Sequence, residues 1–541
     1  MASGTSDTMA WVPTFASKRA ASSDKLRGGY YTPEPLARFL AEWVALAGPR
    51  LLEPSCGNGA ILRHLPDCAA VTAIELEAGE AVKARAAAPA ANVVERDFFE
   101  WFGETQVGSW DGVVGNPPFI RFQHWTEPTR SLAFEVMRTA GLRPTKLTNA
   151  WVPFVVASAL AVRAGGRLGI VVPAELLQVT YAAQLRALLI DEFSQLTAVT
   201  FKRLVFDGVL QEVVLLLGVR GRGPARVSIV EARDAASLPN PESIAGLPHA
   251  PALLHETEKW TKYFLEPAGI AALRRAREQA GVVRLGELAD VDVGVVTGRN
   301  RFFVLRPSSV RSWGLEHHVL PLVSKSAHLR GIRFSGADMA ELQDADAPCH
   351  LLSVARALDL DDDAALRAYV DAGEDEDVHA GYKCSIRTPW WSVPSVWSPD
   401  AFLLRQIYDH PRIVANLTGA TSTDTVHRVR MRNGVSPDVL AAASINSMTF
   451  AFSEVVGRSY GGGVLELEPR EAEALPFPDP HALAPGSVER VDELLRAGGL
   501  VPALEYVDRT LLVEALGFSQ GLVSALRGVW ERLRDRRLSR G

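Results

Sequence analysis

Residues 51–59 read Leu-Leu-Glu-Pro-Ser-Cys-Gly-Asn-Gly, a pattern that closes a strand and opens a helix. The glycines at its end allow the backbone to approach a ligand closely. The spacing differs from the Gly-x-Gly-x-x-Gly loop that binds pyrophosphate, and Glu53 at the end of the strand would repel phosphate oxygens. An acidic residue here favours a ligand that carries a positive charge or free hydroxyl groups.

Two further acidic residues follow this loop, each at the end of a predicted strand. Glu75 lies 22 residues after Glu53, and Asp97 lies 22 residues after Glu75, directly before Phe98. A carboxylate at the end of the second strand of a doubly wound fold binds ribose hydroxyls, and Asp97 is placed to accept adenine amino hydrogens while Phe98 covers the ring. Each acid alone could be an ordinary strand-end residue. Together their order predicts an adenosine without phosphates that carries a cation, namely S-adenosylmethionine.

The most specific motif in the chain is Asn116-Pro117-Pro118-Phe119, which follows the predicted strand 112–115. Ligands bind at this edge of open α/β sheets. The two prolines fix the backbone and remove two N–H donors, which leaves the Asn116 side-chain oxygen and the Pro117 carbonyl as a row of acceptors. Two acceptors on a planar amino group localise its lone pair, and Phe119 can stack on its ring. The motif predicts methylation of such an amino group; the alternative is a simple β-turn.

Hydrophobic periodicity predicts alternating helices and strands from residue 28 to about residue 218. Such alternation predicts a parallel sheet that is covered on both faces. The expected helices are 35–47, 60–65, 79–88, 151–163 and 181–193, and the expected strands are 50–53, 71–76, 93–96, 112–115, 167–172 and 213–218.

The pattern of segments changes after this region. We expect a flexible tail at 1–24, a cofactor-binding catalytic domain at 25–235, a linker at 236–258, a recognition domain at 259–480 and a helical C-terminal segment at 481–541. The expected fold class is α/β, with a Rossmann-like methyltransferase domain followed by an α+β, mostly β, recognition domain.

Composition excludes several classes of protein. The chain has 541 residues, of which 47% are apolar, enough to bury sizeable cores. It has no apolar run of the roughly 18 residues that a membrane span needs, and its four cysteines are too scattered for a disulfide framework or a zinc cluster. These features favour a cytoplasmic protein without a metal site. The net charge of −6 includes the acidic stretch 359–377, so it does not exclude a nucleic-acid partner.

These motifs resemble those of the gamma-class N6-adenine DNA methyltransferases, of which the TaqI methylase is a familiar member. Residues 28–35 look like the family's N-terminal cofactor motif, 53–59 like its cofactor loop and 116–119 like its catalytic motif, with Phe119 where many members have Tyr. The resemblance implies that Phe119 and Phe206 stack on the target base. The implied cofactor-binding residues are Tyr31, Thr32, Glu53, Ser55, Gly57, Glu75, Leu76, Asp97, Phe98, Asn116, Pro118 and Phe154.

The resemblance extends more weakly to residues 293–303 and 457–466, which look like parts of a target-recognition domain. Basic residues there are candidate contacts to double-stranded DNA, although each could equally lie on a solvated face. They are Arg299, Arg301, Lys383, Arg387, Arg428, Arg430 and Arg432. The last three alternate along a strand and are expected on one face.

The predicted function is therefore site-specific DNA adenine-N6 methylation with S-adenosylmethionine, in which the target adenine is flipped out of the duplex. The mark would protect DNA from a separate cognate restriction endonuclease, and a monomer would suffice. The alternatives are a methyltransferase for another planar amine or amide (an RNA base or a protein glutamine), a modification subunit that needs a partner, and a non-catalytic DNA-binding subunit. A magnesium nuclease of the common type needs an acid-x-Lys pair. None is expected here, because no lysine has Asp or Glu two positions before it.

Overall fold

The computed structural model describes residues 31–103, 107–203, 205–206, 212–222, 225–247, 250–251, 259–432, 434–460 and 462–539. The predicted tail 1–24 and the first part of the motif at 28–30 lie outside these residues. Within the described part the chain forms two compact units, the first ending at Pro251 and the second beginning at Lys259. The short stretches 177–180 and 212 group with the second unit.

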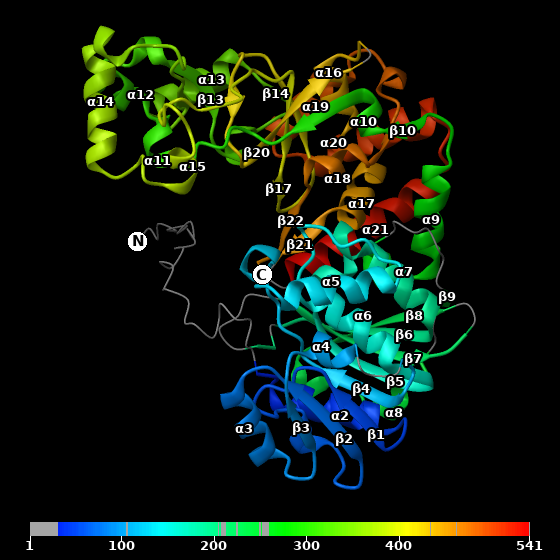
Figure 1. Ribbon diagram of the computed structural model, residues 1–541. Helices are drawn as coiled ribbons and strands as arrows, with labels where there is room; N and C mark the ends of the chain where they lie inside the picture. Colours follow the sequence, from blue (N-terminus) through cyan, green and yellow to red (C-terminus); the bar gives the residue numbers. More distant parts are fainter. Residues whose placement is uncertain are drawn as a thin grey trace, which may run out of the picture. The chain divides into compact units, whose positions relative to one another are not determined.

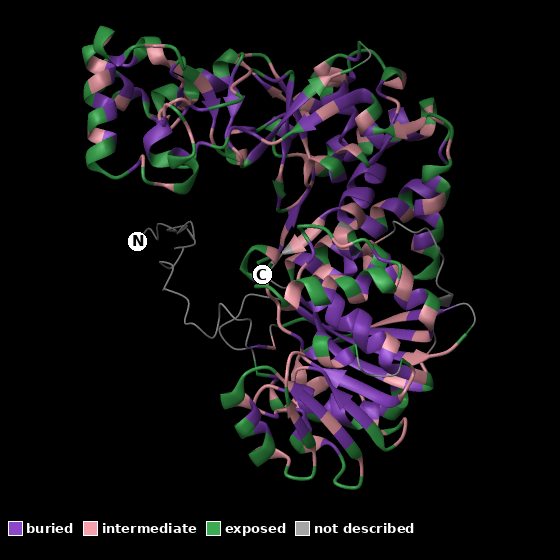
Figure 2. Cartoon of the chain, in the orientation of Figure 1, coloured by how far each residue is buried: buried purple, intermediate pink, exposed green. Residues whose placement is uncertain are grey.

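The first unit is built on a nine-stranded sheet with the order β3-β2-β1-β4-β5-β7-β6-β8-β9 (Figure 1). Its central strands are almost wholly buried (Figure 2), as expected for a sheet covered on both faces. The strands are β1 (Arg50–Glu53), β2 (Ala70–Glu75), β3 (Asn92–Glu95), β4 (Trp110–Gly115), β5 (Val162–Pro173), β6 (Phe193–Phe201), β7 (Val213–Arg220), β8 (Arg226–Ala232) and β9 (Ala250–Pro251).

The sheet is mixed, whereas the sequence predicts a parallel one. Strands β1 to β5 run parallel, but β7 is antiparallel to both β5 and β6. The reason lies in the connection from β6 to β7, which contains no helix among its described residues. A parallel neighbour needs a crossover that usually includes a helix, whereas an antiparallel neighbour does not.

The helices of the first unit agree with the predictions in most places. The helix predicted at 60–65 is only a 3-10 turn at Leu62–His64, and the helix predicted at 151–163 ends at Ala161 because β5 begins at Val162. Helix α5 and strands β6 and β8 are not predicted. The helices are α2 (Glu34–Ala45), α3 (Ala78–Ala87), α4 (Phe98–Phe102), α5 (Thr129–Thr139), α6 (Trp151–Ala161), α7 (Ala183–Glu192) and α8 (Pro241–Ala245).

Helix α2 packs closely on β4 and β5 because two glycines leave room for it. A Cβ atom at Gly112 would lie 2.9 Å from Val44 Cβ, and one at Gly169 would lie 3.1 Å from Trp43 Cδ1. Trp43 also donates a hydrogen bond to the Leu168 carbonyl over 2.8 Å. These contacts fix the first helix above the strands whose ends form the site.

The predicted linker is structured where it is described. Residues 241–245 form α8, whose Ile244 is buried in the same hydrophobic cluster as α2. Strand β9 pairs with β8 and extends the main sheet. The stretch up to Pro251 therefore belongs to the first unit, and residues 252–258 lie outside the described part.

The second unit is α+β. Its main sheets have the orders β11-β20-β16-β18-β14 and β12-β15-β13-β19, beside the smaller β17-β22-β21 and the pair β10-β23. The strands are β10 (Val282–Arg284), β11 (Ala289–Asp292), β12 (Val304–Leu305), β13 (Val319–Val323), β14 (Arg333–Phe334), β15 (His350–Leu352), β16 (Ala401–Leu404), β17 (Gln406–Ile407), β18 (Ile413–Asn416), β19 (Thr421–Ser422), β20 (Val426–Met431), β21 (Arg458–Tyr460), β22 (Val464–Glu466) and β23 (Pro476–Pro478).

The second unit also contains many helices, so it is less dominated by strands than expected. They are α9 (Pro267–Arg277), α10 (Leu285–Leu288), α11 (Asn300–Phe303), α12 (Pro307–Trp313), α13 (Gly336–Asp344), α14 (Ala364–Asp375), α15 (Tyr382–Ser385), α16 (Pro437–Ala443), α17 (Ser447–Val456), α18 (Pro469–Glu473), α19 (Ser487–Arg496), α20 (Leu500–Val507) and α21 (Gln520–Leu538). Within the described residues no single helix is long and apolar enough to cross a membrane, although the bent pair α16 and α17 passes by length and composition together.

The C-terminal helices do not form a segment of their own. Leu504, Leu526 and Trp530 are buried in the same hydrophobic core as Phe402 and Phe450. A second core, around Phe303, Leu351 and Leu366, holds together a separate lobe of the same unit. The boundary predicted at residue 480 therefore separates segments that fold together.

Candidate active site

A cavity of about 660 Å³ opens at the carboxyl ends of β1, β2, β3 and β4. Because these strands run parallel, their ends meet at one edge of the sheet, where ligands bind in open α/β folds. All twelve residues predicted to bind the cofactor line this cavity: Tyr31, Thr32, Glu53, Ser55, Gly57, Glu75, Leu76, Asp97, Phe98, Asn116, Pro118 and Phe154.

The loop after β1 is held against the end of β2 by its backbone. The Cys56 amide donates to the Ile74 carbonyl over 3.0 Å, and the Gly57 amide donates to Glu75 Oε2 over 2.7 Å. Gly59 has a positive φ of 79°, and a Cβ atom there would lie 3.0 Å from the Ala87 Cβ atom. Only glycine fits this turn without strain, so the loop presents its ligand-facing groups in one conformation.

Backbone amides fix the Glu75 carboxylate at the cavity wall. The Gly57 amide bonds one oxygen, and the Glu77 amide bonds the other over 2.9 Å. Each carboxylate oxygen can accept more than one hydrogen bond, so capacity for ligand hydroxyls remains. Burial raises the pKa of Glu75, although the two amide hydrogen bonds work against this rise.

Glu53 is the most unusual group in the cavity. Its residue is only 2% exposed, and Glu53 Oε2 has no hydrogen-bond partner among the described residues. Burial, and secondly the negative charge of Glu75, raise the pKa of Glu53 well above its ordinary value. Buried Ser55 Oγ and Asn58 Oδ1 beside it also lack partners within the described part of the chain. A cationic ligand with hydrogen-bond donors would satisfy these groups.

Asp97 already has several partners. Its Oδ1 atom caps α4 by accepting the Phe99 amide over 2.8 Å and the Glu100 amide over 3.2 Å, and its Oδ2 atom accepts the Thr129 hydroxyl. These contacts orient the carboxylate at the cavity wall. Its contact with an adenine amino group remains a prediction.

Aromatic rings form one wall of the cavity. Phe98 stacks on Phe154 with a centroid distance of 5.3 Å and an interplanar angle of 12°. Trp125 and His124 also line the cavity, and Trp125 packs on Phe99. The sequence does not predict a place for these two residues in the cavity, because residues 120–129 carry no periodic pattern or motif that would put them beside the strand ends.

The Asn-Pro-Pro motif directly follows the carboxyl end of β4. Asn116 and Pro118 line the cavity, and Pro117 is buried. The Ala150 amide donates to the Ile120 carbonyl over 2.9 Å, which ties the following residues to the start of α6. Of the two aromatics predicted to stack on the target base, Phe206 is buried in a hydrophobic cluster, and Phe119 packs against that cluster. Neither is among the described residues that line the cavity.

Two family models match the chain. The model "Eco57I restriction-modification methylase" matches residues 73–206, and "Type II methyltransferase M.Eco57I, C-terminal domain" matches residues 257–512. The chain is 22% identical over 478 residues to the type II methyltransferase M.AccI of Acinetobacter calcoaceticus, covering 82% of this chain and 83% of the relative. It is 23% identical over 471 residues to M.XamI of Xanthomonas campestris pv. amaranthicola, covering 83% and 85% respectively.

The chain is similar over most of its length to type II restriction-modification methyltransferases. It is a DNA methyltransferase that uses S-adenosylmethionine. The cavity fits this cofactor. The sulfonium and ammonium groups of S-adenosylmethionine are cations that suit the unpaired Glu53 carboxylate, and its ribose hydroxyls suit Glu75. The cofactor supplies the methyl group when bound, and the residues of this cavity would bind and orient it.

We expect the methyltransferase to bind S-adenosylmethionine more tightly as the pH rises. A cation favours the ionised form of Glu53, whose pKa in the free site is raised, so protons compete with the cofactor below that pKa and binding releases a proton. Calorimetry in buffers of different ionisation enthalpy measures this release. In Glu53→Gln the affinity should fall about tenfold or more at neutral pH, and the part of its pH dependence that comes from Glu53 should disappear.

The same substitution should stabilise the cofactor-free methyltransferase at neutral pH. A carboxyl group whose folded pKa is raised costs stability once the pH exceeds its unfolded pKa, and glutamine removes that cost. The matched control is Glu242→Gln, an exposed position in α8. A wild-type pH dependence in Glu53→Gln would contradict the assignment.

The structure separates the seven basic candidates in the second unit. Arg428 is only 4% exposed and donates to the Val293 and Ser395 carbonyls, so its prediction as a DNA contact is wrong. Its neighbour Arg430 is exposed and lies over the same Trp397 ring as Arg428. Arg428 and Arg430 therefore lie on one face of β20, as predicted, but Arg428 is bound to backbone carbonyls inside the protein.

Two other arginines are partly engaged inside the protein. Arg387 donates to the Val296 and Thr297 carbonyls over 2.6 and 2.8 Å, and Arg432 forms an ion pair with Asp290. The remaining candidates are exposed: Arg299, Arg301 and Lys383. Arg301 lies 3.9 Å from Glu376.

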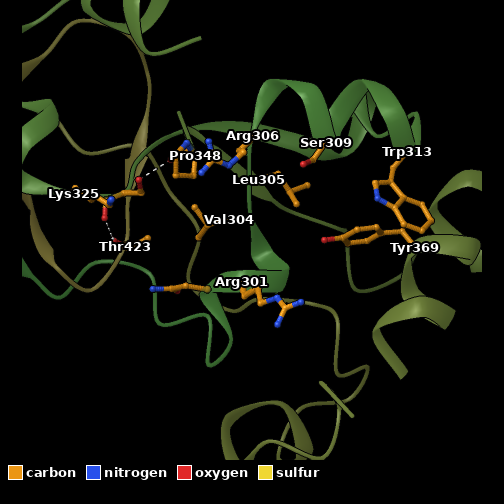
Figure 3. A pocket seen from close by; sticks show the side chains of 12 residues that line it. Arg301, Val304, Leu305, Arg306, Ser309, Trp313, Lys325, Pro348, Tyr369 and Thr423 are labelled. Atoms are coloured by element: carbon orange, nitrogen blue, oxygen red, sulfur yellow. Dashed lines mark hydrogen bonds between the residues drawn. The ribbon is translucent and has the colours of Figure 1, made fainter. Parts of the chain in front are cut away.

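The second unit contains a further cavity of about 410 Å³ (Figure 3). The cations Arg301, Arg306 and Lys325 line it, and no acidic residue is among the described residues of its wall. Trp313 and Tyr369 stand together at one side, with their ring centroids 5.1 Å apart. The cavity thus combines positive charge with aromatic surface.

Proposed function

We propose that this enzyme transfers the methyl group of S-adenosylmethionine to the N6 amino group of an adenine within a specific DNA sequence. The observation that carries the proposal is the position of Asn116 and Pro118 in the wall of the cavity that also contains Glu53 and Glu75. A group bound at Asn116 would lie beside the reactive end of a cofactor held by these carboxylates.

The chemistry of the motif suits an aromatic amine. The nitrogen lone pair of adenine is delocalised into the ring and is a poor nucleophile. The Asn116 oxygen and the Pro117 carbonyl would accept its two N–H groups, localise the lone pair and stabilise the positive charge that grows on nitrogen. No strong base is then required.

An amino group inside a duplex cannot reach this cavity, so we propose that the target adenine is flipped out. Phe119 and Phe206 are the aromatic residues that would hold the flipped ring; Phe119 packs against the hydrophobic cluster in which Phe206 is buried. The second unit would bind the duplex and read its sequence, with Arg299, Lys383 and Arg430 as exposed cations. The resulting mark would protect the sequence from a cognate endonuclease.

The test is modification-sensitive sequencing of DNA from a methylation-free host that expresses this chain alone. We expect N6-methyladenine confined to one short motif, and no mark from the Asn116→Ala variant. A mark at a cytosine amino group would overturn the adenine assignment. Absence of any DNA mark, from protein that still binds S-adenosylmethionine, would move the function to a larger complex or to another planar amine or amide.

Replacement of Phe206 tests base flipping. Phe206→Leu keeps apolar volume in the buried cluster but removes the flat ring, so we expect kcat/KM on matched DNA to fall about tenfold or more. A mismatch opposite the target adenine lowers the cost of extrusion and should restore part of this loss. An equal loss on matched and mismatched substrates would indicate a structural role only. Leu215→Met in the same cluster is the control for core packing.

A further inference from the structure

We give the name apolar knob to a set of residues on two neighbouring segments of the lobe around Phe303. It consists of three exposed apolar residues, Val296, Tyr382 and Ile386, which are 39%, 75% and 63% exposed. Val296 lies in the loop after β11, and the other two lie on or beside α15. Large exposed apolar side chains that gather in one place mark an interaction site more often than isolated ones do.

The two segments that carry the knob are fastened to each other. Arg387 donates to the Val296 and Thr297 carbonyls, and Cys384 Sγ lies 4.0 Å from the Thr297 carbonyl oxygen. A Cβ atom at Gly298 would lie only 2.6 Å from Lys383 Cβ, so the backbones approach closely. The loop is also anchored at its base, where the Val295 amide donates to the Ser422 carbonyl over 2.7 Å. The knob is therefore pre-organised, and little ordering is needed on binding.

The two segments of the knob carry positive charge, while the exposed acidic residues 374–377 precede the second segment. Residues 295–301 and 381–387 contain Arg299, Arg301, Lys383 and Arg387 and no acidic residue. The side chains of Arg299 and Lys383 are exposed. Arg301 lies 3.9 Å from the acidic Glu376, which offsets its charge. An apolar tip flanked by cations complements a DNA groove, whose floor carries thymine methyl groups and whose rims carry phosphates.

The chain runs from the knob directly into the cationic cavity of Figure 3. Asn300 and Arg301 line that cavity together with Arg306 and Lys325. Thr297 in the knob loop is hydrogen-bonded to Asn300, so the two features are directly linked. A cavity without acidic lining beside the knob offers a place for backbone phosphate, which supports DNA over a protein partner.

We infer that the knob enters the major groove of the target DNA and reads thymine methyl groups through Tyr382, Ile386 and Val296. Arg299 and Lys383 bind the flanking phosphates. The major groove is about 12 Å wide and exposes the thymine methyl group, the main apolar feature of a base edge. This inference rests on the proposed function, because it takes the second unit as the DNA-recognition part.

The test separates apolar contacts from phosphate contacts by their dependence on salt. The DNA probe contains the short motif that the wild type methylates. Its dissociation constant is measured between about 50 and 300 mM salt for three proteins: wild type, Tyr382→Ala/Ile386→Ala and Arg299→Ala/Lys383→Ala. The apolar double variant should lose about tenfold or more in affinity with an unchanged slope of log K against log salt. The cationic double variant should reduce the slope by about 2.

Uracil in place of thymine throughout the motif removes the methyl groups. We expect this change to weaken binding of the wild type and to have a much smaller effect on Tyr382→Ala/Ile386→Ala, in which only Val296 of the knob remains. Equal losses in both proteins, or wild-type affinity of the apolar variant, would overturn the inference. Tyr408→Ala/Leu417→Ala, at two other exposed apolar positions of the same unit, is the matched control.

The inference about the knob and the proposed reaction can fail separately. If the wild type marks DNA and the knob variants bind DNA with wild-type affinity, the inference about the knob is refuted and the proposed reaction stands. Wild type that leaves no mark on DNA would refute the proposed reaction, whatever the binding of the variants.

Discussion

Asn116→Ala is expected to lower kcat by about a hundredfold to a thousandfold and to leave the affinity for S-adenosylmethionine close to that of wild type. The Asn116 oxygen would stabilise charge that appears on the amino nitrogen only as the methyl group is transferred, and the loss of one such pre-organised contact typically costs about 10²–10³ in rate. The cofactor carboxylates Glu53 and Glu75 remain in place in this variant. Single-turnover methylation and calorimetry measure the two quantities separately.

The control for this experiment is Asn240→Ala. Asn240 is exposed and caps α8 through the Glu242 amide, so its loss affects a helix end and no group in the cavity. We expect unchanged kcat in the control. Turnover by Asn116→Ala at near wild-type rate would refute the mechanism, whereas loss of cofactor binding would show that Asn116 acts mainly on the cofactor.

Arg537→Met is expected to destabilise the second unit by about 3–5 kcal/mol, the usual result when one partner of a buried ion pair is removed. The side chains of Arg537 and Glu454 are each only 3% exposed, and Arg537 Nη2 lies 2.6 Å from Glu454 Oε1. Arg537 also donates to the Tyr408 carbonyl over 2.8 Å and to the Gly463 carbonyl. The substitution leaves a carboxylate whose pKa burial already raises, together with carbonyls that lose their donor.

Urea denaturation that follows the transition of the second unit measures this change. The double variant Glu454→Met/Arg537→Met should recover part of the loss, because no unpaired charge remains, but not all of it, because the carbonyl oxygens still lack their donor. Arg490→Met removes a solvent-exposed partner of Glu493 and should leave the midpoint nearly unchanged. A small effect of Arg537→Met would show that water reaches this pair in solution.

The sequence predicted the cofactor cavity well because its residues depend on local order along the chain. Glu53, Glu75 and Asn116 each lie at or just after the end of a strand, and parallel strands carry such ends to one edge of the sheet. Strand positions near 50 and 112 were predictable from apolar runs and glycines. Neither the direction of β7 nor the existence of β6 and β8 was predictable in this way, since their pairing depends on neighbours elsewhere in the sheet.

The residues that sequence reasoning missed or misplaced are those whose roles depend on contacts between distant segments. Trp125 joins the cavity wall only because its segment folds back beside Phe99. Arg428 looked like a DNA contact on an alternating strand, yet it bonds Val293, which lies 135 residues away. The sequence shows that a residue is arginine, but not whether its guanidinium group faces solvent or an internal carbonyl.

The sequence by itself thus indicated a cationic adenosine cofactor, and it predicts a planar amino group bound by Asn116 and its prolines. Only the tertiary structure decided which basic residues remain exposed, that the C-terminal helices share the core of the second unit, and that the segments carrying Val296, Tyr382 and Ile386 lie side by side. The physical reason is the range of the interactions. Strand-end chemistry follows from backbone direction over a few residues, whereas burial and ion pairing are set by side chains that meet from positions tens to hundreds of residues apart.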